Sequence, residues 1–457
     1  MSNRHFSSID GVYDFVLGFV NVEKGQATEF KLDRMHWMAA QLGNPHLGRL
    51  TVHVAGSKGK GSVATLIAKT LESSGLRTGL YTSPHILSWK ERITESGIEM
   101  ADELLLKAAE EVYSLVEGRT QEDFPGNELP TFFELTTLIG FCAFRLAGFE
   151  AQVIEVGLGG RLDSTNIVSP NVCVITPIEL EHTQFLGSTI PLIAAEKAGI
   201  IKRSVPVCTI QPKTEAFRVI SKKAEDIGAP CLLVGRDISL SDIKINIHGT
   251  CCRLSATDTT PSNLLRLMQG ASIEISTPLV GSIYAGNMAV SALALSQLDI
   301  ELNTEHMLQG FSSSSMPARF EIVSHSPFVV LDGAHTPESI RTNLSTFLEL
   351  SKAPRILLFG CAHDKKHDEI AKIISPYFDE IIITRPGTFK QSEPAIVFDS
   401  FQKQMSNSIT SDRYLIEDTN SAIAKALSDA REKNASLLVT GSFYLCAEFK
   451  KSRLCSE

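Results

Sequence analysis

A glycine-rich segment between a short β-branched stretch and an apolar helical pattern is the strongest chemical signal in the sequence. It reads Gly56-Ser57-Lys58-Gly59-Lys60-Gly61-Ser62. In such a turn, backbone N–H groups converge on phosphate oxygens, and the following helix adds its positive end. Lys60 can then reach the outer phosphates of a nucleotide, and Ser62 can bind Mg²⁺. The segment predicts a phosphate-binding loop, although Val54 stands where a strict P-loop has its first glycine. The alternative is a glycine-rich surface turn.

Three further polar residues are predicted to lie near the carboxyl edge of a parallel sheet, where ligands usually bind. Glu155 ends a predicted strand, His182 follows the next strand, and Lys197 lies near the end of a helix bounded by Pro191 and Gly199. A carboxylate at the carboxyl edge of an open α/β sheet is suited to bind a metal ion. Each residue also has an ordinary alternative. Glu155 can be a helix cap or a surface residue, His182 can be a hydrogen-bonding loop residue, and Lys197 can be a cation at a helix C-terminus.

Alternating strands and helices must position these residues. Residues 50–55 are predicted to form a strand, 63–71 a helix and 78–82 the next strand, which together make a βαβ unit. Short apolar runs at 152–156 and 172–176 extend a mostly parallel sheet that is buried on both faces. The predicted fold class is therefore α/β, beginning with a P-loop mononucleotide-binding domain.

A change of pattern divides the chain. Residues 236–276 contain short polar-interrupted strands whose layout the sequence leaves open, and the serine run 312–315 before Met316-Pro317 predicts a linker. We therefore expect domains at 1–311 and 316–457. In the second domain, apolar runs separated by helical patterns lie at 328–331, 355–360, 380–384 and 437–440. They predict a smaller, Rossmann-like α/β domain.

Composition narrows the function classes. The chain has 457 residues, which favours two domains, and 43 Lys and Arg against 52 Asp and Glu give a net charge of −9. Without a long basic run, a nucleic-acid or anionic-membrane surface is not expected, and a small-molecule partner is. Nine cysteines without a C-x-x-C pattern argue against a disulfide framework or a zinc knuckle. Neither a signal peptide nor a membrane span is expected, so we predict a cytoplasmic protein, which we expect to be a monomer.

With these residues in view, the sequence resembles the Mur ligase family, and within it the folylpolyglutamate synthase and dihydrofolate synthase branch of the bifunctional bacterial type. The glycine-rich loop resembles the P-loop of that family. Thr82-Ser83-Pro84-His85 and Glu91-Arg92-Ile93 resemble the T-S-P-H and E-R-I motifs of the branch. Similar motifs follow in the family's order over most of the chain, at 130–134, 155–166, 196–202, 332–335 and 441–444.

The resemblance implies an ATP-dependent amide ligase. A carboxylate resists attack by an amine, so the acceptor carboxylate first takes the γ-phosphoryl group of ATP, and the amino group of L-glutamate attacks the resulting acyl phosphate. The implied acceptors are dihydropteroate and the γ-carboxylate of reduced folates. Phosphoryl transfer of this kind depends on positioning and charge neutralisation, here by the loop, Lys60 and two Mg²⁺ ions.

The resemblance also assigns roles to single residues. Lys60, His182 and Lys197 are implied as catalytic, and Gly56, Gly59, Lys60, Gly61 and Ser62 as phosphate-binding. Ser83 and Glu155 are implied to bind one Mg²⁺, with Ser62 as a further candidate. His182 is implied to bind a second Mg²⁺ together with Lys197 in its carbamylated form, N6-carboxylysine. Glu181 stands where the family usually has Asp.

Substrate contacts follow from the same resemblance. Phe133, Asp163 and Ser164 are implied to hold the pterin end of the acceptor, with the Phe133 ring stacked on it, although Phe133 taken alone would be assigned to the core. Contacts with the nucleotide outside the loop are implied for Asn287, Arg319, Asp332 and His335. The sequence departs from the family pattern at Ala318, where W-P-G-R becomes Met-Pro-Ala-Arg. We expect the nucleotide to lie between the two domains.

Two other functions compete with this prediction. A cell-wall precursor ligase acting on a UDP-sugar peptide would share the loop and the metal chemistry, but the T-S-P-H segment and the R-L-D-S-T-N segment at 161–166 argue against it. A nucleotide-binding switch without ligase chemistry would need neither His182 nor Lys197, and the sequence has no guanine-reading N-K-x-D motif.

Overall fold

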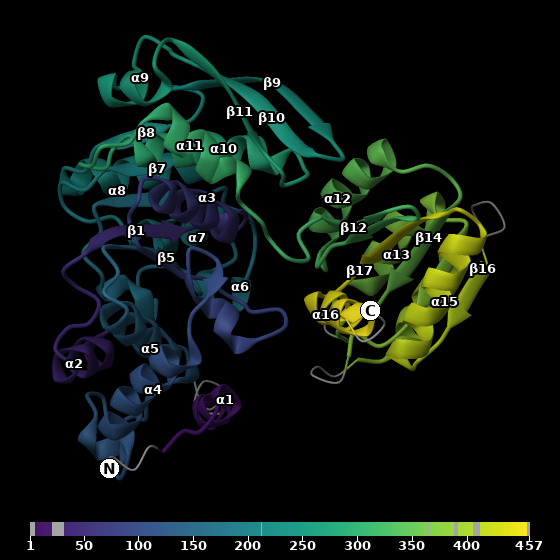
Figure 1. Cartoon of the computed structure of the whole chain (residues 1–457), viewed down its shortest axis with the longest axis horizontal. Helices are drawn as coiled ribbons and strands as arrows, with labels where there is room; N and C mark the ends of the chain where they lie inside the picture. Colours follow the sequence, from purple (N-terminus) through teal and green to yellow (C-terminus); the bar gives the residue numbers. More distant parts are fainter. Residues whose placement is uncertain are drawn as a thin grey trace. The chain divides into compact units, whose positions relative to one another are not determined.

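The computed structural model describes residues 5–20, 32–211, 213–363, 365–387, 392–404 and 412–454, and Figure 1 shows their path. These residues form two compact units. The first contains the described residues up to Ile243, together with Cys251–Ser276 and Ile283–Ser314. The second contains Lys244–Thr250, Thr277–Ser282 and the described residues from Ser315 onward.

The sheet of the first unit has eight strands in the order β4-β3-β2-β5-β1-β6-β7-β8. The pairings from β2 through β8 are parallel, whereas β3 and β4 are antiparallel additions at one edge. The strands are β1 (Leu50–Ala55), β2 (Thr78–Tyr81), β3 (Ile93–Glu95), β4 (Ile98–Glu99), β5 (Ala151–Glu155), β6 (Val172–Ile175), β7 (Val207–Thr209) and β8 (Cys231–Leu233). The predicted mostly parallel sheet is confirmed, and β1 lies at its centre between β5 and β6.

Helices cover both faces of this sheet. The α-helices of the first unit are α1 (Ile9–Leu17), α2 (Asp33–Gln41), α3 (Lys60–Ser73), α4 (Asp102–Val116), α5 (Phe132–Leu146), α6 (Thr183–Leu186), α7 (Ile190–Ala198), α8 (Thr214–Ile227), α9 (Ser262–Met268), α10 (Ile283–Leu295) and α11 (Thr304–Ser312). A second sheet has the order β11-β10-β9 and accounts for the stretch that the sequence left open. Its strands are β9 (Ser239–Asn246), β10 (Gly249–Ser255) and β11 (Ser272–Thr277).

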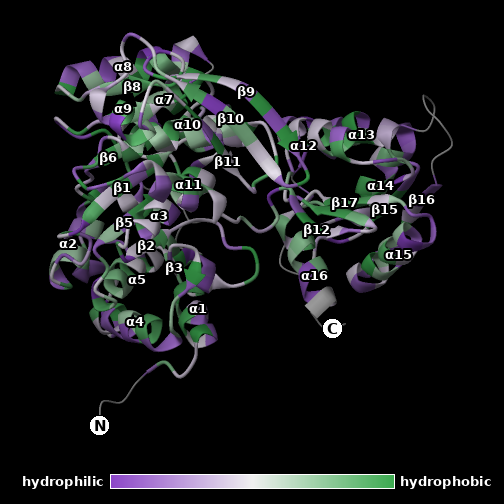
Figure 2. Ribbon diagram, turned by 45° about the horizontal axis from the view of Figure 1, so that its top comes forward, coloured by the Kyte–Doolittle hydropathy of each residue, from purple (hydrophilic) through white to green (hydrophobic). Residues whose placement is uncertain are grey.

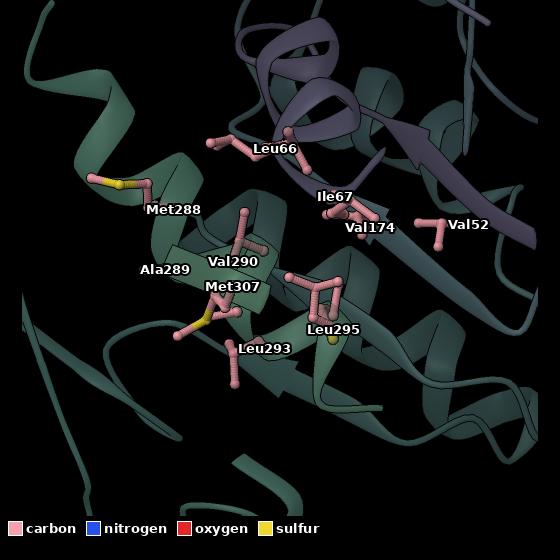
Figure 3. Close-up of a cluster of buried hydrophobic side chains, with 14 of the residues drawn as sticks. Val52, Leu66, Ile67, Val174, Met288, Ala289, Val290, Leu293, Leu295 and Met307 are labelled. Atoms are coloured by element: carbon pink, nitrogen blue, oxygen red, sulfur yellow. The ribbon is translucent and has the colours of Figure 1, made fainter. Parts of the chain in front are cut away.

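The core of the first unit explains why its strands read as continuous apolar runs. Val52 and Val54 of β1 belong to a cluster with residues of α3 and α10. Figure 3 shows part of this cluster, including Val52, Leu66 and Met288. Tyr81 of β2 and Ile154 of β5 point to the opposite face, against α4 and α5. Because successive strand residues are buried on opposite faces, most of them are apolar, and polar exceptions such as His53 and Gln152 are buried.

The second unit has one six-stranded sheet in the order β12-β13-β17-β14-β15-β16, in which only the β12–β13 pair is antiparallel. Its strands are β12 (Glu321–His325), β13 (Phe328–Leu331), β14 (Arg355–Phe359), β15 (Glu380–Ile383), β16 (Asp412–Leu415) and β17 (Ser436–Thr440). Its helices are α12 (Pro337–Leu350), α13 (His367–Ile374), α14 (Pro394–Gln402), α15 (Thr419–Glu432) and α16 (Phe443–Leu454). Hydrophobic and hydrophilic residues alternate along these helices in Figure 2, as expected for elements with one buried face. A second, smaller α/β unit is confirmed.

The serine run, where a linker is predicted, contains the division between the two units after Ser314, but it is more ordered than a linker. Ser312 ends α11, and Ser314 is only 1% exposed. The hydroxyls of Ser312, Ser313 and Ser314 donate to the carbonyl oxygens of Gln309 and Gly310. Because a helix end leaves its last carbonyls without backbone partners, serine side chains can satisfy them and prolong the ordered structure. The expected boundaries at 311 and 316 stay a prediction.

None of the described helices is both long enough and apolar enough to cross a bilayer.

Candidate active site

Two positions of the phosphate loop require glycine because neighbouring side chains approach the backbone closely. The loop joins the end of β1 to Lys60, the first residue of α3. Gly56 has φ 143°, and a Cβ there would lie 1.8 Å from the hydroxyl oxygen of Thr176. Gly59 has φ 88°, and a Cβ there would lie 2.6 Å from Oδ1 of Asn287. Any side chain at either position would therefore distort the loop.

The segment after β6 holds the loop in place. The amides of Ser57 and Lys58 donate to the carbonyl oxygen of Pro177, at 3.0 and 3.3 Å. The Ser57 hydroxyl donates to the carbonyl oxygen of Glu179 at 3.2 Å and accepts from the Glu179 amide at 3.0 Å. The loop is thus fixed at the carboxyl edge of β1 and β6, with Lys60 and Gly61 half-buried.

Asn287 lies at the base of the same loop. Its Nδ2 donates to the hydroxyl of Ser62 at 2.8 Å, and Ser62 donates to the carbonyl oxygen of Gly59 at 3.0 Å. Both side chains are buried. The structure therefore brings a residue of α10 to the start of α3. A contact between Asn287 and adenine stays a prediction.

Ser83 and Glu155 form the next part of the site. Glu155 is the last residue of β5, is 4% exposed, and its Oε2 accepts from the Ser83 amide at 3.0 Å. Because β5 and β2 are adjacent parallel strands, the residues at their carboxyl ends meet. The hydroxyl and carboxylate oxygens are donors that Mg²⁺ accepts, and its remaining ligands are usually waters and substrate phosphates. The residues present fit this ion.

Lys197 contacts the phosphate loop directly. Its side chain is 2% exposed, and Nζ donates to the carbonyl oxygen of Gly56 at 2.7 Å and to Oε1 of Glu181 at 2.8 Å. Burial and the nearby charge of Lys60 lower the pKa of Lys197 to about 8, whereas Glu181 opposes this shift. The end of α7 therefore delivers a buried amine to the loop.

Glu181 is a site residue to which the sequence analysis gave no role. Burial raises the pKa of its carboxyl group, but the charges of Lys197 and Lys60 and the hydrogen bonds from Lys197 and Ser57 outweigh it, so the net shift is downward. The sequence marked the position only as a departure from the Asp of the family. Its partner, Lys197, lies in a later helix, so no local sequence pattern indicates that the two residues are paired.

His182 is placed next to this cluster but faces outward. It is exposed, has φ 45°, and caps α6, where its carbonyl oxygen accepts from the amides of Phe185 and Leu186 at 2.8 and 3.0 Å. Among the described residues, no three His, Cys, Asp or Glu side chains gather as a metal centre. The second-metal role of His182 stays a prediction.

The carboxylate of Asp163 organises the loop between β5 and the short helical turn Ser164–Ile167. Its Oδ2 accepts from the Leu158 amide at 2.8 Å, and its Oδ1 accepts from the amide and the hydroxyl of Thr165 at 3.0 and 2.5 Å. Burial raises the pKa of Asp163, and these bonds oppose the shift. Ser164 beside it is half-buried. Asp163 holds the loop in this structure, and direct contacts of Asp163 and Ser164 with a pterin stay a prediction.

Phe133 lies against the same loop. It belongs to the first turn of α5, and a Cβ on Gly157 would lie 2.3 Å from the Cζ atom of its ring. Its ring centroid is 6.1 Å from that of Tyr81. Phe133 is half-buried, so it serves the core and borders the site at once.

The start of α5 depends on Arg34, a residue that the sequence analysis missed. The Nε atom of Arg34 lies 3.1 and 3.0 Å from the two carboxylate oxygens of Glu134, and a second guanidinium nitrogen lies 2.9 Å from Oε2. Glu134 is 4% exposed and also accepts from the Thr131 amide at 2.8 Å. Only tertiary structure joins two residues so far apart in the chain.

The second unit gathers its predicted residues around Phe443. The Arg319 guanidinium lies 4.4 Å from the centroid of the Phe443 ring, and the His335 ring packs edge-on against it with centroids 6.1 Å apart. Asp332 is buried and accepts from the amides of Phe320 and Ala334, both at 2.8 Å. These residues form one cluster at the carboxyl end of β13, and their contact with a nucleotide stays a prediction.

Family models match both parts of the chain. The Mur ligase middle domain matches residues 54–295, and the Mur ligase glutamate ligase domain matches residues 318–443. The first match includes the phosphate loop, and the second includes the cluster around Phe443.

Similar proteins extend over nearly the whole chain. A folylpolyglutamate synthase of Lacticaseibacillus casei is 33% identical over 418 residues, covering 90% of this chain and 92% of the relative. A dihydrofolate synthase/folylpolyglutamate synthase of Bacillus subtilis is 31% identical over 429 residues, covering 92% and 94%. A solved structure of E. coli FolC in complex with DHPP and ADP is 25% identical, covers 98% of each chain and gives a TM-score of 0.81. Through these matches and the loop geometry, the chain belongs to the Mur ligase family, in the branch of the folylpolyglutamate and dihydrofolate synthases.

Proposed function

We propose that this chain is an ATP-dependent ligase that joins L-glutamate to dihydropteroate and to the γ-carboxylate of reduced folates. The observation that carries the proposal is the phosphate loop, with Lys197 bonded to it and Glu155 at the neighbouring strand end. The names of the relatives from Lacticaseibacillus casei and Bacillus subtilis support the two acceptors. The residues themselves support the phosphoryl transfer.

The reaction divides into two displacements. An acceptor carboxylate oxygen attacks the γ-phosphorus of ATP, forming an acyl phosphate and releasing ADP. The glutamate nitrogen then attacks the carbonyl carbon, loses a proton, and expels inorganic phosphate to leave the amide. The loop amides and Lys60 hold the phosphates and offset their charge, which is the main contribution a protein makes to such a transfer.

Ser83 and Glu155 are proposed to hold one Mg²⁺. When bound, this ion neutralises charge on the phosphate oxygens. Ser62 is the weaker candidate ligand, because its hydroxyl already donates to Gly59 and accepts from Asn287.

Lys197 is proposed to be carbamylated, with a second Mg²⁺ nearby held with His182. The support is position: the amine is buried, and it lies against the phosphate loop and Glu181. A carbamate would be an anion beside a carboxylate, and such a pair needs a cation close by. The second ion would supply that charge.

The remaining contacts complete the proposal. Arg319, Asp332 and His335 are proposed to face the nucleotide, and Asn287 to meet the adenine. Phe133 and Ser164 are proposed to contact the pterin end of the acceptor, with Asp163 acting at least through the loop that it holds. We further propose a cytoplasmic enzyme that acts as a monomer, which gel filtration tests.

An assay with separate acceptors tests the function. The purified protein receives ATP, Mg²⁺ and L-glutamate with either dihydropteroate or tetrahydrofolate, and both ADP release and product mass are measured. We expect one glutamyl addition to each acceptor. Turnover of tetrahydrofolate but not of dihydropteroate would indicate an enzyme that only extends folates. Turnover of neither acceptor, together with activity on a UDP-sugar peptide, would support the cell-wall precursor ligase instead.

A further inference from the structure

Three buried polar side chains form an unbroken hydrogen-bond relay from β1 to the loop after β5. Nε2 of His53 lies 2.9 Å from the Thr165 hydroxyl oxygen. That hydroxyl donates to Oδ1 of Asp163 at 2.5 Å, and Oδ2 of Asp163 accepts from the Leu158 amide at 2.8 Å. His53 and Thr165 are 0% exposed, and Asp163 is 5% exposed. The relay therefore runs entirely inside the protein.

The number of protons on the Thr165 hydroxyl determines which group donates in each hydrogen bond of the relay. The Thr165 hydroxyl has one proton, which it gives to Asp163, so its oxygen accepts from His53. His53 must then carry its proton on Nε2. Burial, helped by the charge of Lys202, lowers the pKa of His53 to about 3, which agrees with a neutral ring. A single tautomer thus connects β1 to the carboxylate.

The far end of the relay lies beneath the proposed acceptor contact. Asp163 holds the Leu158 amide, and the preceding Gly157 backbone packs directly under the Phe133 ring. At its near end, His53 lies three residues before Gly56, on the strand that leads into the phosphate loop. The relay therefore ties the loop under Phe133 to the strand that carries the phosphate loop.

We propose that His53 and Thr165 are positioning residues that set how well the enzyme binds its acceptor, by holding the loop of residues 157–163 in register with β1. The inference rests on the proposed function for the identity of the acceptor. It assigns neither residue a contact with substrate. The competing explanation is that both residues only fill the core.

Conservative and isosteric variants separate these explanations. Thr165→Val keeps the shape of the side chain but removes the hydroxyl, and Thr165→Ser keeps the hydroxyl. His53→Gln keeps a donor near the Nε2 position, and His53→Leu removes it. We expect Thr165→Val and His53→Leu to raise KM for the acceptor about tenfold, the effect of one buried hydrogen bond, with KM for ATP within about twofold. Thr165→Ser and His53→Gln should recover most of the loss.

Hydrogen exchange supplies a readout that does not need turnover. In Thr165→Val, amide exchange should accelerate in the peptide spanning residues 157–163 and stay unchanged in α8 and α15. Equal rises in KM for acceptor and ATP, or unchanged exchange in that peptide, would overturn the proposal. If the unmutated protein turns over neither acceptor, the proposed function fails, and faster exchange confined to 157–163 would still support the positioning role.

Discussion

Lys197 and Lys60 both lie at the phosphate loop, but they differ in burial. Lys197 is buried and its ammonium is engaged by Gly56 and Glu181. Lys60 is half-buried at the start of α3 and lies close enough to influence both charged neighbours. Because Lys197 is engaged within the protein, the proposed phosphate contact falls to Lys60 rather than to Lys197.

Replacing Lys60 tests the loop. Lys60→Ala should reduce turnover at least about a hundredfold, because it removes the charge that is proposed to offset that of the transferred phosphoryl group. The free energy of unfolding should change by less than about 0.5 kcal/mol, since the side chain is not a packing residue. Lys69→Ala, on the same helix, is the matched control and should keep normal turnover. Near-normal turnover of Lys60→Ala would remove the loop from the mechanism.

Variants of Lys197 test the proposed carbamylation, because a lysine can form a carbamate and an alanine or arginine at this position cannot. Lys197→Ala should lose activity, and a small carboxylate such as acetate should restore part of it by replacing the carbamate. Lys197→Arg keeps a cation but cannot be carbamylated, so it should stay inactive. Steady-state turnover with and without acetate measures both effects. Normal turnover of Lys197→Arg would contradict carbamylation.

Motifs pointed to residues that the first unit brings to one edge of its sheet, but they could not reveal which residues are paired. Glu181 and Lys197 are partners because β6 and α7 converge on the loop. Arg34 meets Glu134 only in the folded chain. The R-L-D-S-T-N segment illustrates the limit: the structure shows that Asp163 and Thr165 bond within their own loop, and the motif alone could not show this.

At the scale of elements, the turn before β12 carries backbone strain. Ala318 has φ 52° and Phe320 has φ 51°, conformations that cost a residue with a Cβ about 1–2 kcal/mol. The family pattern has glycine at the position of Ala318. The turn is held by the Asp332 carboxylate, which accepts from the Phe320 amide.

Ala318→Gly should stabilise the protein. Relief of the positive φ outweighs the added freedom of the unfolded chain, so we expect a gain of about 0.5–1 kcal/mol in the free energy of unfolding. Urea unfolding monitored on the second unit measures it. Ala424→Gly, at an exposed position of α15, should instead lose about 1 kcal/mol. Destabilisation of Ala318→Gly would show that the strain is not relieved.

The Arg34–Glu134 pair predicts how α5 is anchored. Arg34→Gln leaves a buried carboxylate without its cation and should cost about 3 kcal/mol of stability. Arg34→Gln combined with Glu134→Gln should recover much of that loss, because no buried charge then remains. Unfolding of the single and double variants forms the cycle, and additive losses would exclude a coupled pair.

The positions of strands and helices could be predicted from the sequence more reliably than the points where they end. β1 was predicted at 50–55 from its β-branched, alternating residues and forms at Leu50–Ala55. The order of the serine run was not predictable, because it depends on hydroxyls that donate to the last carbonyl oxygens of α11. The sheet of β9 to β11 gave no periodic signal, since its exposed faces tolerate polar residues.

At the scale of the whole molecule, the site of the first unit exists because parallel strands bring distant residues to one edge. The loop after β1, Ser83 after β2 and Glu155 at the end of β5 follow neighbouring strands. Sequence patterns predicted the strands but not their order, since pairing depends on which faces pack together rather than on local residue types.

One acceptor site should serve both substrates. Dihydropteroate and reduced folate share the pterin and aminobenzoyl groups and differ in the added glutamate, so each should inhibit turnover of the other competitively. The inhibition constant of dihydropteroate against folate extension should equal its own KM within about twofold. Initial rates at crossed concentrations measure this, and noncompetitive inhibition would indicate two separate sites.

The central place of β1 also has a consequence for synthesis of the chain. Leu50 pairs with Ala151, roughly a hundred positions later, and Val52 pairs with Val172. A ribosome that adds roughly 5–20 residues per second needs on the order of 5–25 s to deliver both neighbours after β1 has been made. During that interval the nascent chain carries the glycine-rich loop without the sheet that shapes it. ATP therefore cannot assist the early folding of this unit and can stabilise it only after β5 and β6 have joined β1.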